Sequence, residues 1–209
     1  MDAEVFRAWI VSAAGVIETN RDHLTQLDAA IGDADHGINL SRGFTAVLGA
    51  LDSAAKTPGA ILTLTGNTLI SKVGGASGPL CGTAFRRAGK ALGGAPDVDL
   101  PALSAALEAA LAGVQQLGAA REGDKTMVDA LAAATRAFSK AIAEGASPDD
   151  TLSVLAEAAS AGAAATVSMQ ALKGRASYLG PRSVGHEDPG AVSTALILGA
   201  LRDAARAGR

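Results

Sequence analysis

Three aspartates near the N-terminus have a spacing that would let them share a cation. Asp28, Asp33 and Asp35 lie within the segment LDAAIGDADHGIN (27–39). Their offsets of five and seven residues would separate them on a continuous helix, but Gly32 allows the helix to end and the chain to fold back. Carboxylates gathered in this way repel one another unless a cation neutralises them, and hard oxygen ligands favour magnesium. The pattern predicts a magnesium site, although each aspartate alone is more simply explained by helix capping or loop solvation.

The segment GGASGPLCGT (74–83) has the composition of a phosphate-binding turn. Its glycines and small side chains leave backbone N–H groups accessible ahead of a helix, whose dipole adds to the attraction for an anion. The segment lacks the spacing and the lysine of a Walker A motif. A close crossing of two helices is the structural alternative, and a neighbouring magnesium site would favour the phosphate interpretation.

Two further segments, EGDKT (122–126) and KGRASYLGPRSVGHEDPG (173–190), are also rich in charged residues. In the first, we expect Asp124 to cap the following helix. Lys125 is expected either to meet a phosphate or to be exposed. Met127 is expected in the core or against the face of a purine.

The 173–190 segment offers phosphate ligands together with its own anchors. Arg175 and Arg182 carry planar guanidinium groups that suit phosphate oxygens. Tyr178 and Leu179 are predicted to hold the long loop against the rest of the protein. The structural alternative for the basic residues is a solvated loop.

The elements that must position these segments are predicted to be helices. Apolar residues make up 48% of the chain, aromatic residues only 3%, and alanine, the strongest helix former, is abundant. Apolar side chains recur at helical spacing, and no segment alternates with the period of a strand. Asp99, Ser147 and Asp188 are candidate N-caps, each followed by a proline within two residues. The predicted helices cover residues 4–28, 38–53, 58–73, 80–92, 100–118, 126–144, 148–172 and 191–207.

The connections between these helices alternate between plain linkers and the four segments described above, which we call the chemically rich segments. Short connections favour antiparallel neighbours, so every second connection lies at the same end of the molecule. The four rich segments therefore should meet at one end, and the linkers at about 54–57, 93–99 and 145–147 at the other. We predict an all-α, antiparallel, up-and-down bundle of eight helices, forming a single domain over residues 1–209, with the functional site in the loops at one end.

Charge and composition exclude several classes of partner. The chain has 18 basic and 21 acidic residues and no basic run, which argues against nucleic acid. The single cysteine, Cys81, rules out an internal disulfide and fits a reducing cytoplasm. Neither a signal pattern nor an apolar stretch long enough to span a bilayer is present, so we expect a soluble cytoplasmic protein with no membrane partner.

Carboxylate-held magnesium, an amide-rich turn and an arginine loop together fit phosphoryl transfer. That chemistry depends on positioning and charge neutralisation and requires little covalent chemistry from the protein. No catalytic nucleophile is assigned, since Ser77 and Cys81 lack an identifiable base nearby.

The same segments resemble the signature segments of the dihydroxyacetone kinase nucleotide-binding (L) domain family. LDAAIGDADHGINLSRGF, VGGASGPLCGTAF, GDKTMVDAL and GRASYLGPRSVGHEDPGA carry the likeness, in order, over residues 24–195. Cys81 stands where an aromatic residue is common, and Pro181 replaces a usual acidic residue. The resemblance implies an eight-helix antiparallel barrel, in agreement with the helix count.

The resemblance also implies a set of ligands for ADP or ATP and for two magnesium ions. Asp28, Asp33 and Asp35 would hold the magnesium ions. The residues implied to contact the nucleotide are His36, Gly37, Ile38, Asn39, Ala76, Ser77, Gly118, Met127, Arg175, Asp188, Pro189 and Gly190.

The family has two branches, which differ in how the nucleotide is used. In one, the L domain is fused to a substrate-binding K domain and uses free ATP. In the other, a separate L subunit keeps bound ADP, which the M subunit of a phosphotransferase system recharges. This chain has no K domain, and TVSMQALKGRASYLG resembles the separate bacterial subunit. The resemblance therefore favours the phosphotransferase-dependent branch, in which dihydroxyacetone held on a K subunit receives the phosphoryl group.

Three alternatives stay open. One is an ATP-dependent two-subunit kinase for a short ketose or tetrose, in which free ATP would suffice. Another is a regulatory module that binds nucleotide, docks a transcription factor and transfers no phosphate. The third is a magnesium-dependent phosphohydrolase, which would release phosphate from ATP without a partner.

Overall fold

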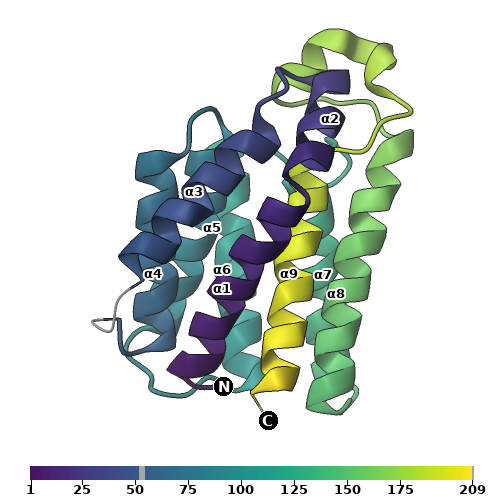
Figure 1. Ribbon diagram of the computed structural model, residues 1–209. Coiled ribbons are helices and arrows are strands. Elements are labelled where there is room, and N and C mark those ends of the chain that lie inside the picture. Colours follow the sequence, from purple (N-terminus) through teal and green to yellow (C-terminus); the bar gives the residue numbers. More distant parts are fainter. Residues whose placement is uncertain (52–54, 209) are drawn as a thin grey trace.

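The computed structural model describes residues 1–51 and 55–208, and within these ranges every regular element is a helix (Figure 1). The elements are α1 (Ala3–Thr19), α2 (Arg21–Ile31), α3 (His36–Ala50), α4 (Pro58–Lys72), α5 (Ser77–Leu92), α6 (Leu100–Gly118), α7 (Met127–Ala143), α8 (Pro148–Ala165), the 3₁₀-helices η1 (Thr166–Ser168) and η2 (Arg175–Ser183), and α9 (Pro189–Ala207). None of these helices is long and apolar enough to cross a membrane. The prediction of an all-α fold is confirmed for the described part of the chain.

The chain runs up and down between the two ends of the bundle. The connections after α2, α4, α6 and α8 lie at one end, uppermost in Figure 1, and both termini lie at the other. Helices α1 and α9 pack against each other and close the arrangement. The four chemically rich segments therefore share one end, as the alternation of connections predicts.

Three helix starts have the predicted caps. The side chain of Asp99 accepts a hydrogen bond from the N–H of Ala102 at 2.8 Å, and that of Ser147 accepts from Asp150 at 3.2 Å. Asp188 caps α9 in the same way. Each cap satisfies a backbone donor that a helix start leaves without an intrahelical partner.

One predicted helix is divided into two in the structure. The helix predicted over 4–28 is divided at Asn20, where ψ rises to 10° and the side-chain amide donates to the carbonyl of Val16 at 2.8 Å. Such a local hydrogen bond competes with helix continuation. The described residues therefore form nine α-helices in place of eight, since α1 and α2 replace one.

The C-terminal limits of two further helices also differ. Helix α8 ends at Ala165 and not near Leu172, because the chain tightens into η1. The helix predicted over 38–53 begins at His36 and ends at Ala50. Residues 52–54, which include the end of that prediction and part of the following linker, lie outside the described residues.

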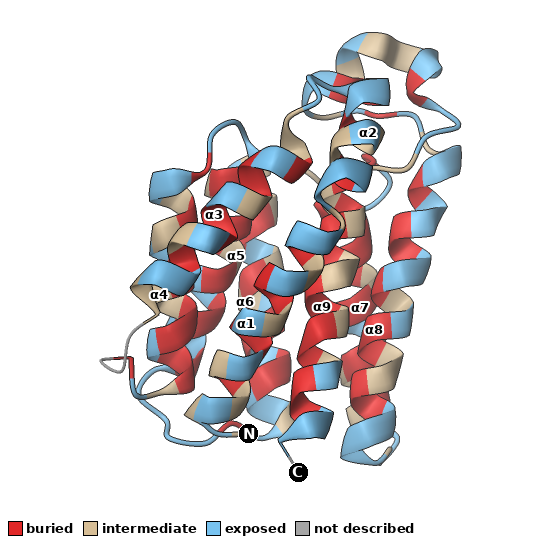
Figure 2. Ribbon diagram, in the orientation of Figure 1, coloured by how far each residue is buried: buried red, intermediate tan, exposed pale blue. Residues whose placement is uncertain are grey.

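The core lies along the inner faces of the helices, where buried positions follow one side of each ribbon (Figure 2). Trp9 is central: its indole N–H donates to the carbonyl of Ile197 at 2.8 Å, which joins α1 to α9. Its ring lies 5.7 Å from that of Phe85 and 5.8 Å from that of Phe6. These contacts tie the first, fifth and last helices together and make a rigid support for the loops.

Candidate functional site

The three predicted aspartates converge where α2 passes into α3. Oxygens of Asp28, Asp33 and Asp35 all lie within 4.8 Å of one another. The Asp28 carboxylate accepts the N–H groups of Asp35 at 2.8 Å and of His36 at 3.1 Å, so it caps α3 from the neighbouring helix. A side chain at Gly32 would collide with that carboxylate. The chain thus folds back at Gly32, as the sequence predicts.

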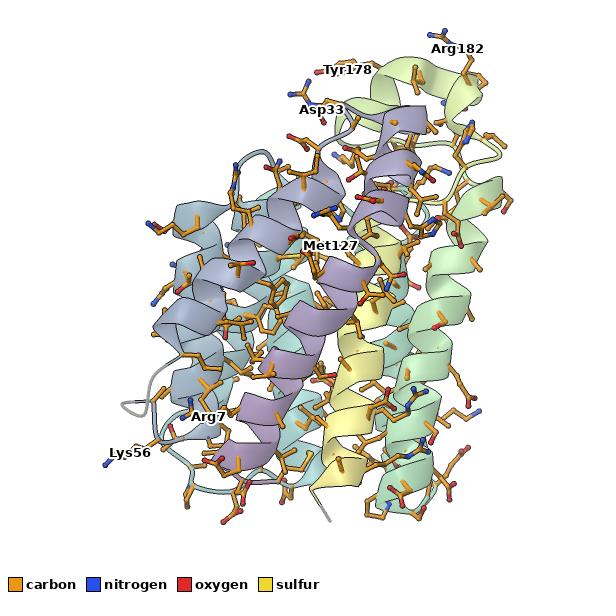
Figure 3. The ribbon with its side chains drawn as sticks, in the orientation of Figure 1. Arg7, Asp33, Lys56, Met127, Tyr178 and Arg182 are labelled. Atoms are coloured by element: carbon orange, nitrogen blue, oxygen red, sulfur yellow. The ribbon has the colours of Figure 1, made fainter. Side chains whose placement is uncertain are left out.

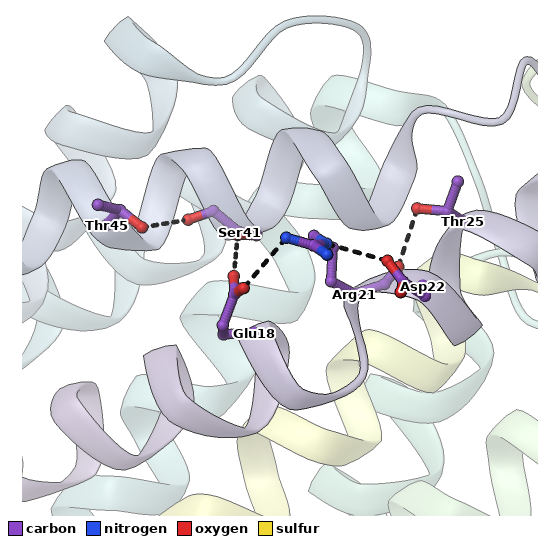
Figure 4. A network of polar contacts seen from close by, with 6 residues as sticks. All are labelled: Glu18, Arg21, Asp22, Thr25, Ser41 and Thr45. Carbon is purple, nitrogen blue, oxygen red and sulfur yellow. Dashed lines mark hydrogen bonds and ion pairs between the residues drawn. The ribbon is translucent and has the colours of Figure 1, made fainter.

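A close crossing of α2 and α3 fixes this geometry. A Cβ atom at Gly37 would collide with the carbonyl oxygen of Arg21, so only glycine permits the approach. Figure 4 shows the polar contacts beside the crossing: Ser41 donates to Glu18, and Arg21 contacts Glu18 at 3.2 Å and Asp22 at 3.0 Å. The crossing sets where α3 starts relative to Asp28.

The donor set of the cluster suits a hard cation. The gathered side chains offer only carboxylate oxygens, which are the ligands that magnesium prefers. Asp28 is buried, Asp35 half-buried and Asp33 exposed, so the cluster opens toward solvent on one side. On that side Arg175 Nε lies 3.0 Å from an oxygen of Asp33. The residues present therefore fit magnesium, with coordination positions left for water or phosphate.

A cavity of about 300 Å³ opens beside the cluster and collects residues from all four rich segments. Its polar lining includes Asp28, Asp35, His36, Ser77, Lys125, Arg175 and Asp188. Its apolar wall includes Leu80, Cys81, Val114, Met127 and Val128. Ala76, Gly118, Pro189 and Gly190 complete the predicted residues that line it. A charged rim and an apolar wall suit a ligand with a phosphate end and a flat apolar end.

Four of the predicted site residues do not line this cavity. Asp33 belongs to the carboxylate cluster beside it. Gly37 is buried in the helix crossing, and Ile38 is 51% exposed. Asn39 is buried, and its side-chain oxygen accepts from Arg42 at 2.9 Å. These last three lie in the first turn of α3.

Four side chains that line the cavity have shifted pKa values, and the shift of one of them, Lys125, is described with its contacts below. Burial lowers the pKa of His36, against the opposing effect of Asp28 and Asp35, and its Nε2 lies 3.0 Å from the hydroxyl of Ser193. Burial raises the pKa of Asp188 to about 7, although the N–H of Ala191 partly offsets the shift. Burial raises the pKa of the Cys81 thiol to about 12, so this thiol is no nucleophile at neutral pH.

The 122–126 segment corrects the prediction that Asp124 caps the following helix. Thr126, and not Asp124, is the N-cap of α7. Asp124 instead accepts the N–H of Arg121 at 2.9 Å. Asp129 completes a capping box and accepts from Gly123 at 2.5 Å and from Thr126 at 2.8 Å. Asp129 was not predicted from the sequence, although an acidic residue three positions after a threonine is a signature of this box.

Lys125 is neither exposed nor free to extend to solvent. It is 1% exposed, its ammonium donates to the carbonyls of Thr166 and His186, and burial lowers its pKa. No local signal predicts this, because both partners are distant in sequence. Met127 belongs to the core, as predicted, and it also lines the cavity, whereas its contact with the face of a purine stays a prediction.

Only one of the two predicted loop anchors is correct. Leu179 packs with the buried cluster of Ile31, Ala171 and Ala176, whereas Tyr178 is 88% exposed. Residues three apart lie on the same side of a 3₁₀-helix, so Leu179 follows Ala176 inward and Tyr178 points out. In Figure 3 Tyr178, Arg182 and Asp33 project at the same end of the molecule.

Comparisons with known proteins agree with this geometry. The profile of the DAK2 domain matches residues 30–203. The PEP-dependent dihydroxyacetone kinase ADP-binding subunit DhaL of Escherichia coli (strain K12) is 42% identical over 95% of both chains. The corresponding PTS-dependent subunit of Lactococcus lactis subsp. lactis (strain IL1403) is 39% identical over 92% of this chain and 93% of its own.

A solved structure shares the fold. The dihydroxyacetone kinase from C. freundii, in complex with AMP-PNP and Mg²⁺, superposes with a TM-score of 0.71 and 27% identity. The match covers 97% of this chain but only 34% of that longer one. The profile match and the extent of identity lead to one assignment: the chain belongs to the DAK2 domain family.

Proposed function

We propose that this chain is the ADP-binding subunit of a dihydroxyacetone kinase. It transfers a phosphoryl group from a magnesium-bound nucleotide to dihydroxyacetone held on a partner K subunit. The observation that carries the proposal is the meeting of the carboxylate cluster, the glycine-rich turn and Arg175 at one cavity. The names of the two DhaL relatives, similar over nearly their whole length, support the same activity.

Asp28, Asp33 and Asp35 would hold the metal, and the resemblance to the family implies two magnesium ions. When bound, magnesium supplies charge neutralisation for the phosphate oxygens. The residues of this chain orient the cluster: the start of α3 fixes Asp28, and Arg175 contacts Asp33 at 3.0 Å. Arg175 would donate to phosphate oxygens from the open side.

The nucleotide would lie across the cavity from its charged rim to its apolar wall. Ala76 and Ser77 begin α5, so their N–H groups and the helix dipole would meet phosphate. Asp188, Pro189 and Gly190 begin α9 on the other side.

The base would contact Met127 and the end of α6 at Gly118. Contacts from His36, Gly37, Ile38 and Asn39 are expected at the first turn of α3, where His36 lines the cavity. The whole chain would act as one nucleotide-binding domain.

We also propose that the nucleotide stays bound as ADP and is recharged by the M subunit of a phosphotransferase system in the cytoplasm. The PEP-dependent and PTS-dependent relatives support this branch. The C. freundii enzyme, with AMP-PNP in a chain about three times as long, supports the rival in which ATP exchanges freely.

Identifying the nucleotide that copurifies with the protein tests the proposal. The protein is purified without added nucleotide, denatured, and the released compounds are separated by chromatography. Stoichiometric ADP supports a retained cofactor. An empty protein that binds ATP when supplied favours the ATP-dependent rival, and one that binds no nucleotide with magnesium overturns the function. Failure to transfer phosphate with a competent K subunit would favour a regulatory module.

A further inference from the structure

Lys125 combines a buried charge with a strained backbone, and the proposed chemistry uses neither. The side chain is 1% exposed, and lysine is almost never fully buried without partners. Its φ of +59° lies in the left-handed region, which a non-glycine residue occupies at a cost. Such a conformation persists only where the surroundings impose it, and it is concentrated at functional sites.

The ammonium group of Lys125 bridges two distant parts of the chain. Nζ donates to the carbonyl oxygen of Thr166 at 2.5 Å and to that of His186. These carbonyls lie at the two ends of the connection between α8 and α9. We call residues 166–172 and 183–188, which form the base of this connection, the stem.

Further hydrogen bonds show that the two sides of the stem lie together. The N–H of Gly185 donates to the carbonyl of Val167 at 2.7 Å. The N–H of Ala171 donates to the hydroxyl of Ser183 at 2.9 Å. The neighbour of Lys125 also contributes, since the carbonyl of Asp124 accepts from Leu172 at 3.0 Å.

The stem carries groups of the candidate site. The hydroxyl of Thr166 accepts the N–H of Asp188 at 2.9 Å, which fixes the residue that caps α9 and lines the cavity. Arg175 begins the 3₁₀-helix that the stem supports. The Lys125 ammonium therefore lies between the two sides of the stem.

We propose that Lys125 is a positioning residue for the nucleotide, which joins the two sides of the stem and so holds Asp188 and Arg175 at the cavity. The inference rests on the nucleotide-binding function proposed above. An ammonium has three N–H donors, and two of them are used by the carbonyls of the stem. The group acts mainly on the loop, and its effect on the ligand passes through the residues that the loop carries.

Three variants of the full chain test this inference. Lys125→Met keeps the length of the side chain and removes its donors, whereas Lys125→Arg keeps the charge and several donors. Lys90→Met is the matched control, since Lys90 is exposed on α5. Hydrogen–deuterium exchange of nucleotide-free protein measures the stem, and calorimetric titration with Mg²⁺ and ADP measures binding.

Lys125→Met should speed exchange in 166–172 and 183–188 and weaken Mg–ADP binding, each by about tenfold or more, because hydrogen bonds from a charged group are lost. Lys125→Arg should keep most of the wild-type protection from exchange and most of the wild-type affinity for Mg–ADP. Lys90→Met should match wild type in both measurements. Weakened binding with unchanged exchange would overturn the positioning role and assign Lys125 a direct contact with the ligand. Unchanged binding in Lys125→Met would overturn it as well.

Two further outcomes are separable. If Lys125→Met does not fold, as judged by circular dichroism, Lys125→Gln retains N–H donors without the charge and should give intermediate values; wild-type behaviour in that variant would contradict the proposal. If wild-type protein binds no Mg–ADP, the nucleotide function and the ligand part of this inference both fail. The exchange rates of Lys125→Met would then still decide whether Lys125 holds the stem.

Discussion

Arg175 Nε lies 3.0 Å from a carboxylate oxygen of Asp33, which joins the 3₁₀-helix of the long loop to the carboxylate cluster. Both side chains are substantially exposed, at 69% and 39%, so this ion pair itself contributes little to stability. Its importance is spatial. The arginine and the cluster lie on the same side of the cavity, where phosphate oxygens could contact the guanidinium and a cation held by the carboxylates together.

Asp33→Ala should abolish retention of nucleotide while leaving the helical fold intact. The change removes one of the three gathered carboxylates but no buried contact, because Asp33 is exposed. Nucleotide released from denatured protein is measured by chromatography, and folding by circular dichroism. Asp97→Ala is the control, since Asp97 is exposed in the linker between α5 and α6 at the other end. Retained nucleotide in Asp33→Ala would refute the metal-site assignment.

Arg182→Glu should weaken association with the K subunit about tenfold without affecting folding, because charge at the rim of an interface sets complementarity. Arg182 projects from the loop-bearing end, from which the phosphoryl group must leave (Figure 3). Lys56→Glu is a matched charge reversal at the opposite end, where Figure 3 places Lys56. Affinities for the isolated K subunit are compared by surface plasmon resonance. Equal affinities for the two variants would count against docking at the loop end.

The arrangement of the loops was predictable because it depends only on the order of helices and on short connections. Caps such as Asp99 and Ser147 were equally predictable from the sequence, since a capping contact joins residues only three positions apart. The break at Asn20 could not be predicted, because the helical spacing of apolar residues continues through it. The hydrogen bond from the Asn20 side chain does not change that spacing.

Contacts between segments that are distant in the chain could not be predicted from the sequence. The partners of Lys125 lie 41 and 61 residues away, and only the folded chain brings them together. Tyr178 and Leu179 were indistinguishable as anchors because their orientation depends on the 3₁₀ geometry of that turn. Asp28, Asp33 and Asp35 were found because a glycine lies among them and all three carry the same chemistry.

Gly37→Ala should destabilise the protein by about 1–3 kcal/mol, because the new methyl group collides with the Arg21 carbonyl and forces α2 and α3 apart. The same displacement moves the start of α3 from Asp28, so affinity for Mg–ADP should fall too. Gly15→Ala is the control: nothing lies within 4 Å of its Cβ, and this exposed helical site should gain up to about 1 kcal/mol. Urea unfolding measures the free energy of unfolding of both variants. A Gly37→Ala protein as stable as wild type would contradict the close crossing.

Cys81 should resist alkylation in the native protein. A thiol with a pKa raised to about 12 is almost wholly protonated at neutral pH, and only the thiolate reacts readily. Mass spectrometry after iodoacetamide treatment should show little adduct in native protein and full modification in guanidinium chloride. Because Cys81 lines the cavity wall, Mg–ADP should slow the native reaction further. Rapid native alkylation would show that the thiol is not buried as the structure has it.

Asp188 should make the stability of the nucleotide-free protein depend on pH. Its pKa is raised by burial from about 4 to about 7, so the folded state binds a proton more tightly than the unfolded state. The stabilising contribution is complete below the unfolded pKa and is lost as pH rises through the folded pKa. Between about pH 4 and pH 7, the free energy of unfolding should therefore fall relative to that of Asp188→Asn.

Asparagine can still accept the N–H of Ala191 through its side-chain oxygen, so α9 keeps its cap and the comparison isolates the ionisation. Urea titrations of both proteins, stripped of metal and nucleotide, measure the difference across this range. A constant difference would mean that Asp188 ionises as freely in the folded chain as in the unfolded one, and that burial at the start of α9 does not control its charge.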